Sequence, residues 1–154
     1  MNLQIVDWKE GAKPPVQLPD PGFMNSLGEK GIRKLISDHY DLLVKSDVKH
    51  LFPSTINELE KAKLRASDFF IQICGGYPFY NENRGNPMMT KRHEPFEITN
   101  KVRKIWLGCY KELLPELNVP HDYVISFWNY LNVFSLWMVN SPRANQFQNL
   151  KLDT

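Results

Sequence analysis

The four histidines are the first candidates for chemistry in this chain, and their spacing limits what that chemistry can be. No two of them stand at an HxxxH spacing or beside a cysteine; they are His39, His50, His93 and His121. A zinc site needs three or four protein ligands at once, so the pattern gives zinc little support. A haem iron needs less from the protein, because the porphyrin supplies four nitrogens and one axial imidazole can suffice.

Composition and charge narrow the class of protein further. At 154 residues and 42% hydrophobic content, the chain is expected to form one domain with a sizeable core. Cys74 and Cys109 form no CxxC pair, and we interpret both as buried thiols. The formal net charge is +2, and no block of like charge exceeds a few residues, so nothing in the charge pattern favours nucleic-acid binding.

No segment has the composition of a membrane span or of a secretory leader. Polar residues interrupt the longest uncharged apolar run, residues 124–139, and its spacing is helical. Residues 1–20 carry charges and prolines where a leader would be apolar. We therefore expect a cytoplasmic protein.

Helical periodicity dominates the chain from Gly28 onward. The apolar positions of the first expected helix recur at intervals of three and four residues, at Ile32, Leu35, Ile36, Tyr40 and Leu43. A second helix is expected after a capping box formed by Thr55 and Glu58, and Gly75 should end it. A third helix can be capped by Thr99 or its neighbour, and Pro120 suits the first turn of a fourth.

These elements predict an all-α protein with four substantial helices, because no stretch alternates like a β-strand and no segment repeats. Residues 1–27 are rich in proline and aperiodic, and they are expected to form an irregular arm. Residues 28–142 are expected to form the helical domain, with a loop from Gly75 to about Pro87. Residues 143–154 are expected to form a polar tail.

A series of motifs at fixed separations runs through the second half of the chain. It comprises GGYPFYNENRGNPMMTKRHEPF, from Gly75 to Phe96, and then Trp106 in KIWLGCYKEL, thirteen residues after His93. Together these motifs resemble the truncated haemoglobins, a bacterial globin family, and the GG pair and RGNP loop favour its group II. The resemblance covers about residues 28–142. It implies a truncated globin fold, a two-over-two α-helical sandwich around haem b (iron protoporphyrin IX).

The resemblance gives His93 a specific role. On its residues alone, the segment TKRHEPF places His93 in a basic loop, where it would be an ordinary polar residue. The family match implies that His93 is the proximal ligand of the haem iron. A neutral imidazole would bind iron through Nε2 and donate its other N–H to a backbone carbonyl, which fixes the ring.

The resemblance also implies a distal, gas-binding side. Tyr40 and Trp106, which by helical position alone would be core residues, take the places of the family's two distal hydrogen-bond donors. Phe52 corresponds to an aromatic residue that packs on the haem, and it lacks the hydroxyl that tyrosine provides in some relatives. Ala62 and Ala66 are small where bulkier or polar residues are expected, and they predict an open distal side.

Further residues are candidates for contact with the haem itself. By position, two arginines would pair with propionates and one tyrosine would hydrogen-bond a propionate, while the remaining side chains would give apolar contact. The alternatives are solvated surface arginines and ordinary core packing. The candidates are Arg65, Arg92, Tyr80, Met89, Phe69, Phe70 and Phe96.

Three functions are compatible with these features. The resemblance implies reversible binding of dioxygen, NO and CO, with no dedicated enzyme activity and no catalytic residues. Turnover as an NO dioxygenase or peroxidase would require a separate reductase as a partner, because this chain carries no flavin or nicotinamide domain. A haem-free helical interaction module is the remote alternative, but it gives no reason to retain His93, Tyr40 and Trp106 together. Monomer and homodimer, and the physiological role, stay open.

Overall fold

The protein is described here from a computed structural model that places residues 1–141. The polar tail expected at 143–154 lies outside the described residues. Within them every regular element is a helix and there is no strand, as the sequence predicted. The long helices are α1 (Pro21–Leu43), α2 (Ile56–Ile73), α5 (Asn100–Leu113) and α6 (His121–Met138). The shorter elements are α3 (Phe79–Arg84), α4 (Met89–His93) and the 3-10 turns η1 (Lys49–Leu51) and η2 (Leu114–Glu116).

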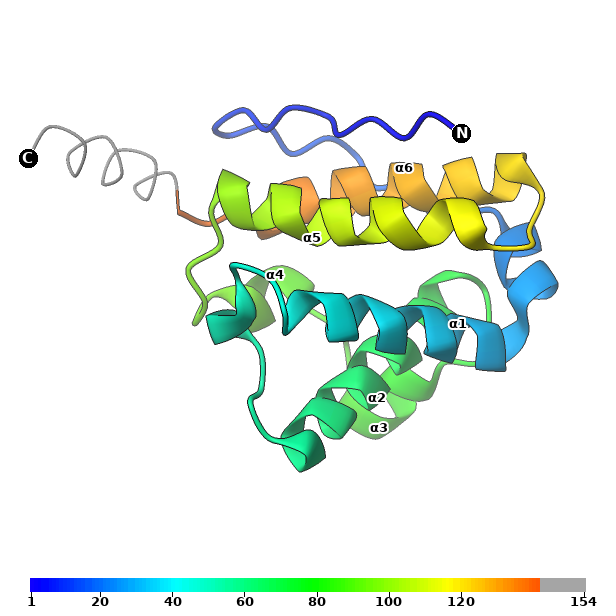
Figure 1. Ribbon diagram of the computed structural model, residues 1–154, viewed down its shortest axis with the longest axis horizontal. Coiled ribbons are helices and arrows are strands. Elements are labelled where there is room, and N and C mark those ends of the chain that lie inside the picture. The colour runs from blue at the N-terminus through cyan, green and yellow to red at the C-terminus, as the bar shows by residue number, and fades with distance from the viewer. Residues whose placement is uncertain (142–154) are drawn as a thin grey trace, which may run out of the picture.

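The four long helices form two layers (Figure 1). Helices α5 and α6 lie side by side in one layer, and α1 and α2 form the other, with α4 at one end between them. Fully buried side chains from both layers meet at their interface; they include Ile32, Ile36, Leu107, Phe127 and Leu131. This arrangement is the two-over-two helical sandwich that the resemblance implied.

Local side-chain signals start and end the helices where the sequence placed them. Thr55 Oγ1 accepts a hydrogen bond from the Glu58 amide at 3.3 Å, and Thr99 Oγ1 accepts one from the Val102 amide at 3.1 Å. The Glu58 carboxylate pairs with a lysine instead of completing a capping box. After α2 the chain leaves the helix through Gly75, whose φ of 94° is accessible chiefly to glycine.

The first helix begins earlier than the sequence predicted, so the expectation of irregular structure through residue 27 is wrong beyond Asp20. Asp20 Oδ1 accepts a hydrogen bond from the Gly22 amide at 2.8 Å, and Pro21 occupies the first turn. Phe23 is fully buried and stacks on Phe127 at 4.3 Å between ring centroids. A kink at Gly28, with φ 71° and ψ 171°, interrupts the periodicity and hides this first segment from a pattern search.

Residues 1–20 form an ordered arm that lies along α6 (Figure 1). The side chain of Leu3 is buried beneath it. Main-chain groups of the arm pair with side chains of α6: Gln4 with Trp128 at 3.0 Å, Val6 with Asn132 at 2.8 Å and Pro14 with Trp137 at 2.8 Å. The arm is therefore part of the folded domain's surface layer.

The stretch expected as a loop from Gly75 to Pro87 contains α3, which a buried ion pair fixes. The Asp68 carboxylate on α2 contacts Arg33 of α1 at 3.0 Å and Arg84 of α3 at 2.8 Å, and its side chain is only 3% exposed. Six residues give too weak a periodic signal for a helix to be predicted. The ion pair ties α3 to both helices of its layer, immediately before α4.

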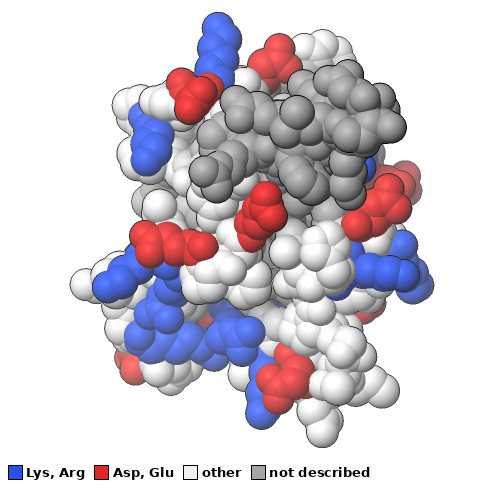
Figure 2. All heavy atoms as spheres, turned by 90° about the vertical axis from the view of Figure 1, so that its left-hand side faces the viewer, with Lys and Arg blue, Asp and Glu red and all other residues white. Residues whose placement is uncertain are grey.

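The surface and the thiols largely follow the sequence expectations. No helix within residues 1–141 has an apolar stretch long enough to span a bilayer. Cys74 is buried, and burial raises the pKa of its thiol to about 12, whereas Cys109 is only partly buried. Figure 2 shows charges of both signs on the end of the molecule at the left of Figure 1, with Lys and Arg gathered toward the lower part of that view.

Candidate functional site

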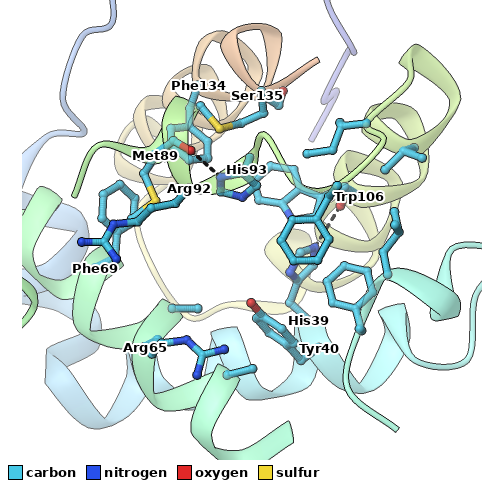
Figure 3. Close-up of a pocket in the computed structure, with 18 of the residues that line it drawn as sticks. His39, Tyr40, Arg65, Phe69, Met89, Arg92, His93, Trp106, Phe134 and Ser135 are labelled. Carbon is cyan, nitrogen blue, oxygen red and sulfur yellow. Dashed lines mark hydrogen bonds between the residues drawn. The ribbon is translucent and has the colours of Figure 1, made fainter. Parts of the chain in front are cut away.

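A cavity of about 730 Å³ lies between the two helical layers (Figure 3). Every residue that the resemblance assigned to the haem or to its gas-binding side lines it, from His93 and Tyr40 to the apolar contacts such as Phe69 and Met89. Its volume falls within the range of roughly 300–1,000 Å³ that is usual for small-molecule and cofactor sites. The fold thus brings together residues that are up to 66 positions apart, from Tyr40 to Trp106.

His93 is the last residue of α4, and it presents its ring to the cavity (Figure 3). Its Nδ1 lies 2.6 Å from the carbonyl oxygen of Met89. A carbonyl can only accept a hydrogen bond, so Nδ1 carries the proton and Nε2 retains a free lone pair. Burial lowers the pKa of His93, which favours the neutral form that a metal requires. The bond to a backbone carbonyl that the resemblance implied is present.

Tyr40 faces the cavity from the opposite layer, with its hydroxyl directed inward (Figure 3). Its ring meets Phe52 edge to face, with 5.6 Å between centroids. Burial raises the pKa of Tyr40, while the nearby Arg65 guanidinium opposes that shift, so the hydroxyl keeps its proton at neutral pH. The site therefore has a hydrogen-bond donor across the cavity from His93.

His39 is a cavity residue that sequence reasoning missed. Its Nε2 lies 2.9 Å from the Trp106 carbonyl oxygen, its ring stacks on Tyr110 at 3.6 Å, and it meets the Trp106 ring edge to face at 5.2 Å. Burial lowers the pKa of His39 to about 3, so the ring is neutral. His39 thereby joins α1 to α5 and holds Trp106 in place. The signal was present, because His39 falls on the inward face defined by Ile32, Leu35, Ile36 and Leu43.

Tyr110 adds a polar atom without a partner next to this cluster. Its side chain is fully buried and lines the cavity, and its hydroxyl has no hydrogen-bond partner within residues 1–141. Buried polar groups are usually paired, so an orphan in the wall of a cavity is consistent with a site that takes a further group.

Arg103 is another cavity residue that the sequence did not reveal. It is 1% exposed and lines the cavity, and it donates hydrogen bonds to Ser135 Oγ at 2.9 Å, to the Val6 carbonyl at 2.6 Å and to the Asn132 carbonyl at 3.1 Å. Burial lowers the pKa of Arg103 to about 10, which leaves it cationic at neutral pH. Through this residue the N-terminal arm is connected to the cavity wall.

The residues expected near haem propionates differ in their surroundings. Arg65 is exposed at the edge of the cavity. Arg92 is also exposed, but its guanidinium donates to the main-chain carbonyls of Pro87 at 2.6 Å and of Arg84 and Asn86 at 3.1 Å each. Tyr80 is buried, with the guanidinium groups of Arg84 and Arg92 each 5.4 Å from its ring. Arg92 is thus largely engaged with the loop before α4.

The rest of the lining is mostly apolar. Ala62, Phe69 and Phe70 are buried on α2, Ala66 is partly buried beside them, and Phe96 is 44% exposed at the rim. Nowhere in the described part of the chain do three or more His, Cys, Asp or Glu side chains gather as a metal site. A mostly apolar cavity into which the His93 imidazole points fits a flat porphyrin that supplies the other four ligand nitrogens.

Comparison with known proteins agrees with this geometry. The family model for bacterial-like globins matches residues 23–140. Group 2 truncated hemoglobin YjbI of Bacillus subtilis is 29% identical over 120 residues, covering 77% of this chain and 89% of that protein. The structure of phosphate-bound Hell's gate globin IV has a TM-score of 0.82 and 34% identity, over 90% of this chain and 87% of that one. The structure of a truncated oxygen-avid haemoglobin from Bacillus subtilis has a TM-score of 0.71 and 28% identity, over 77% of this chain and 99% of that one. The chain therefore belongs to the bacterial-like globin family, with the fold of the group II truncated haemoglobins, and this membership implies that it binds haem.

Proposed function

We propose that the protein binds haem b with His93 as the proximal ligand and binds dioxygen and other diatomic gases reversibly on the opposite side. The observation that carries the proposal is the 2.6 Å bond from His93 Nδ1 to the Met89 carbonyl. It fixes the tautomer in which Nε2, the nitrogen that would hold the iron, has a free lone pair beside a large apolar cavity.

The haem supplies the iron at which a gas binds, and the chain's own residues determine how long the gas stays. Tyr40 and Trp106 are the proposed donors, through the phenol O–H and the indole N–H. A diatomic ligand whose outer atom carries partial negative charge is stabilised by such preplaced donors in a dry cavity. A hydrogen bond to a charged acceptor contributes about 1.5–3 kcal/mol, or roughly one to two decades in the dissociation rate. Slow release is therefore expected.

Access to this side is proposed to be easy, because small side chains line it. Ala62 and Ala66 stand on the α2 face that borders the cavity, and neither can fill the space near Tyr40. Phe52 offers a ring without a hydroxyl, so it adds apolar contact and no third donor. This combination supports fast gas uptake together with slow release. A truncated haemoglobin similar to this chain is described as oxygen-avid.

The test is the absorption spectrum of the purified protein, as isolated and after dithionite and carbon monoxide. We expect a strong Soret band that shifts with carbon monoxide. The band should be lost or altered in His93→Ala, and it should be preserved in the matched control His121→Ala, which changes an exposed histidine at the start of α6. A protein that stays colourless after haem is added would contradict the proposal, and unchanged spectra in His93→Ala would place the ligand elsewhere.

A further inference from the structure

The helix that carries His93 is too short to orient it alone. Helix α4 has five residues, and isolated helices of this length are unstable. The residue before it, Met88, has left-handed backbone angles of φ 41° and ψ 53°, and no side chain caps the helix there. The main chain that carries the His93 ring must therefore be held by contacts from other elements.

Asn140, two residues beyond the end of α6, supplies such contacts to the segment that follows α4. Its side-chain Nδ2 donates to the carbonyl oxygen of His93 at 3.2 Å and to that of Phe96 at 2.9 Å. Its Oδ1 accepts from the Ile98 amide at 2.9 Å, and its own amide donates to the Ile98 carbonyl at 3.0 Å. The carboxamide thus uses both its donors and its acceptor on residues 93–98, a pattern that needs an Asn or Gln side chain.

The opposite end of α4 is held by a different side chain. Arg92 donates to three main-chain carbonyls in residues 84–87, just before the helix begins. Arg92 therefore bonds the main chain before α4, and Asn140 bonds the main chain at its end and beyond it. Of the two, only Asn140 bonds the carbonyl group of His93 itself.

We propose that Asn140 is a positioning residue for the proximal histidine. Its carboxamide fixes the main chain at His93, while the bond from Nδ1 to Met89 fixes the rotation of the ring, and together they determine where Nε2 stands. The inference rests on the proposed function of His93. Ligand groups need to be held within about 0.5 Å of their working geometry, which is the scale that a main-chain clamp can control.

The test compares Asn140→Asp with wild-type protein. Aspartate has nearly the same size as asparagine and keeps an acceptor oxygen, but it loses both N–H donors. Asn140→Ala removes the donors without adding a charge, so it separates the two effects. In the ferrous haem-loaded protein we expect the iron–histidine stretching band in the resonance Raman spectrum to shift, and haem loss to become about tenfold faster. The matched control is Ser141→Ala, which removes the neighbouring 3.1 Å bond to Glu97 and leaves the His93 carbonyl bonded. It should change neither quantity. A band that stays in place in both Asn140 variants would overturn the inference.

A second measurement separates this inference from the proposed function. If the wild-type chain takes up no haem, the proposed function fails. Nitrogen NMR of the His93 ring in the haem-free chain then tests whether Asn140 positions that ring. We expect the Nδ1-protonated tautomer in wild-type protein and in Ser141→Ala, and a mixture of tautomers in Asn140→Asp. The same tautomer in all three proteins would show that Asn140 does not position the ring.

Discussion

Acid should destabilise this protein through His39. The folded protein holds the pKa of His39 at about 3 because the ring is buried between α1 and α5, whereas the ordinary value is 6.5. Between these values the unfolded chain binds a proton that the folded chain rejects. A group with a depressed folded-state pKa contributes stability above its unfolded pKa, and that stability is lost as pH falls toward the folded value.

The size of the effect follows from the width of this window. Each pH unit within it changes the free energy of unfolding by about 1.4 kcal/mol. Lowering the pH from about 7.5 to about 4.5 should therefore remove roughly 2–3 kcal/mol through His39 alone. Burial lowers the pKa of His93 as well, so its protonation acts in the same direction and must be separated from that of His39.

The variant His39→Phe makes this separation. Phenylalanine keeps a ring to stack on Tyr110 but cannot titrate. The loss of the bond to the Trp106 carbonyl lowers the free energy of unfolding by the same amount at every pH. Urea denaturation followed by circular dichroism across this pH range measures both proteins. We expect the variant to be less stable at neutral pH and to lose roughly 2–3 kcal/mol less than wild type on acidification. Stability curves that run parallel for the two proteins would refute the reasoning.

Three further substitutions test the packing and the gas-binding side. Asp68→Asn leaves two arginines without their buried carboxylate and should lower the free energy of unfolding by about 2–4 kcal/mol in urea denaturation, whereas the surface control Asp38→Asn should cost less than about 1 kcal/mol. Equal losses in the two would show that burial does not strengthen the Asp68 pair. Ala66→Leu should slow carbon monoxide association in flash photolysis, and unchanged rates would mean that gas reaches the site by another route. Tyr40→Phe should speed dioxygen release about 10- to 100-fold in stopped-flow measurements, and an unchanged rate would remove Tyr40 from the distal site.

The sequence predicted best those features that depend on a few neighbouring residues. Thr55 and Thr99 each cap a helix by accepting a bond from an amide three residues ahead, so the signal and its partner lie within one turn. The motif around His93 also led to the residues that line the cavity, because the family resemblance assigns positions along the whole fold. The five residues of α4 and the six of α3 are too short for periodicity to identify.

What the sequence concealed depends on partners far along the chain. The buried face of α5 consists of Arg103, Leu107 and Tyr110, and the charge on Arg103 makes this face hard to identify from the sequence. Burying that cation becomes acceptable only once Val6 and Asn132 supply acceptors from 97 and 29 residues away. His39 was missed for a related reason, since a polar residue within an apolar stripe was not counted as part of it.

The manner in which the arm is attached distributes evolutionary constraint unevenly. Besides a few side-chain contacts, made by Leu3, Ile5 and Lys13, the arm offers main-chain groups such as the carbonyls of Gln4 and Val6, and the side chains that bind these groups belong to the helices. Every amino acid carries the same carbonyl, so we expect the exposed side chains of the arm to tolerate mutation. We expect selection to act more strongly on the residues that receive the arm, such as Trp128 and Asn132. In a related globin, an arm of this kind would be recognised from the helix that receives it rather than from its own sequence.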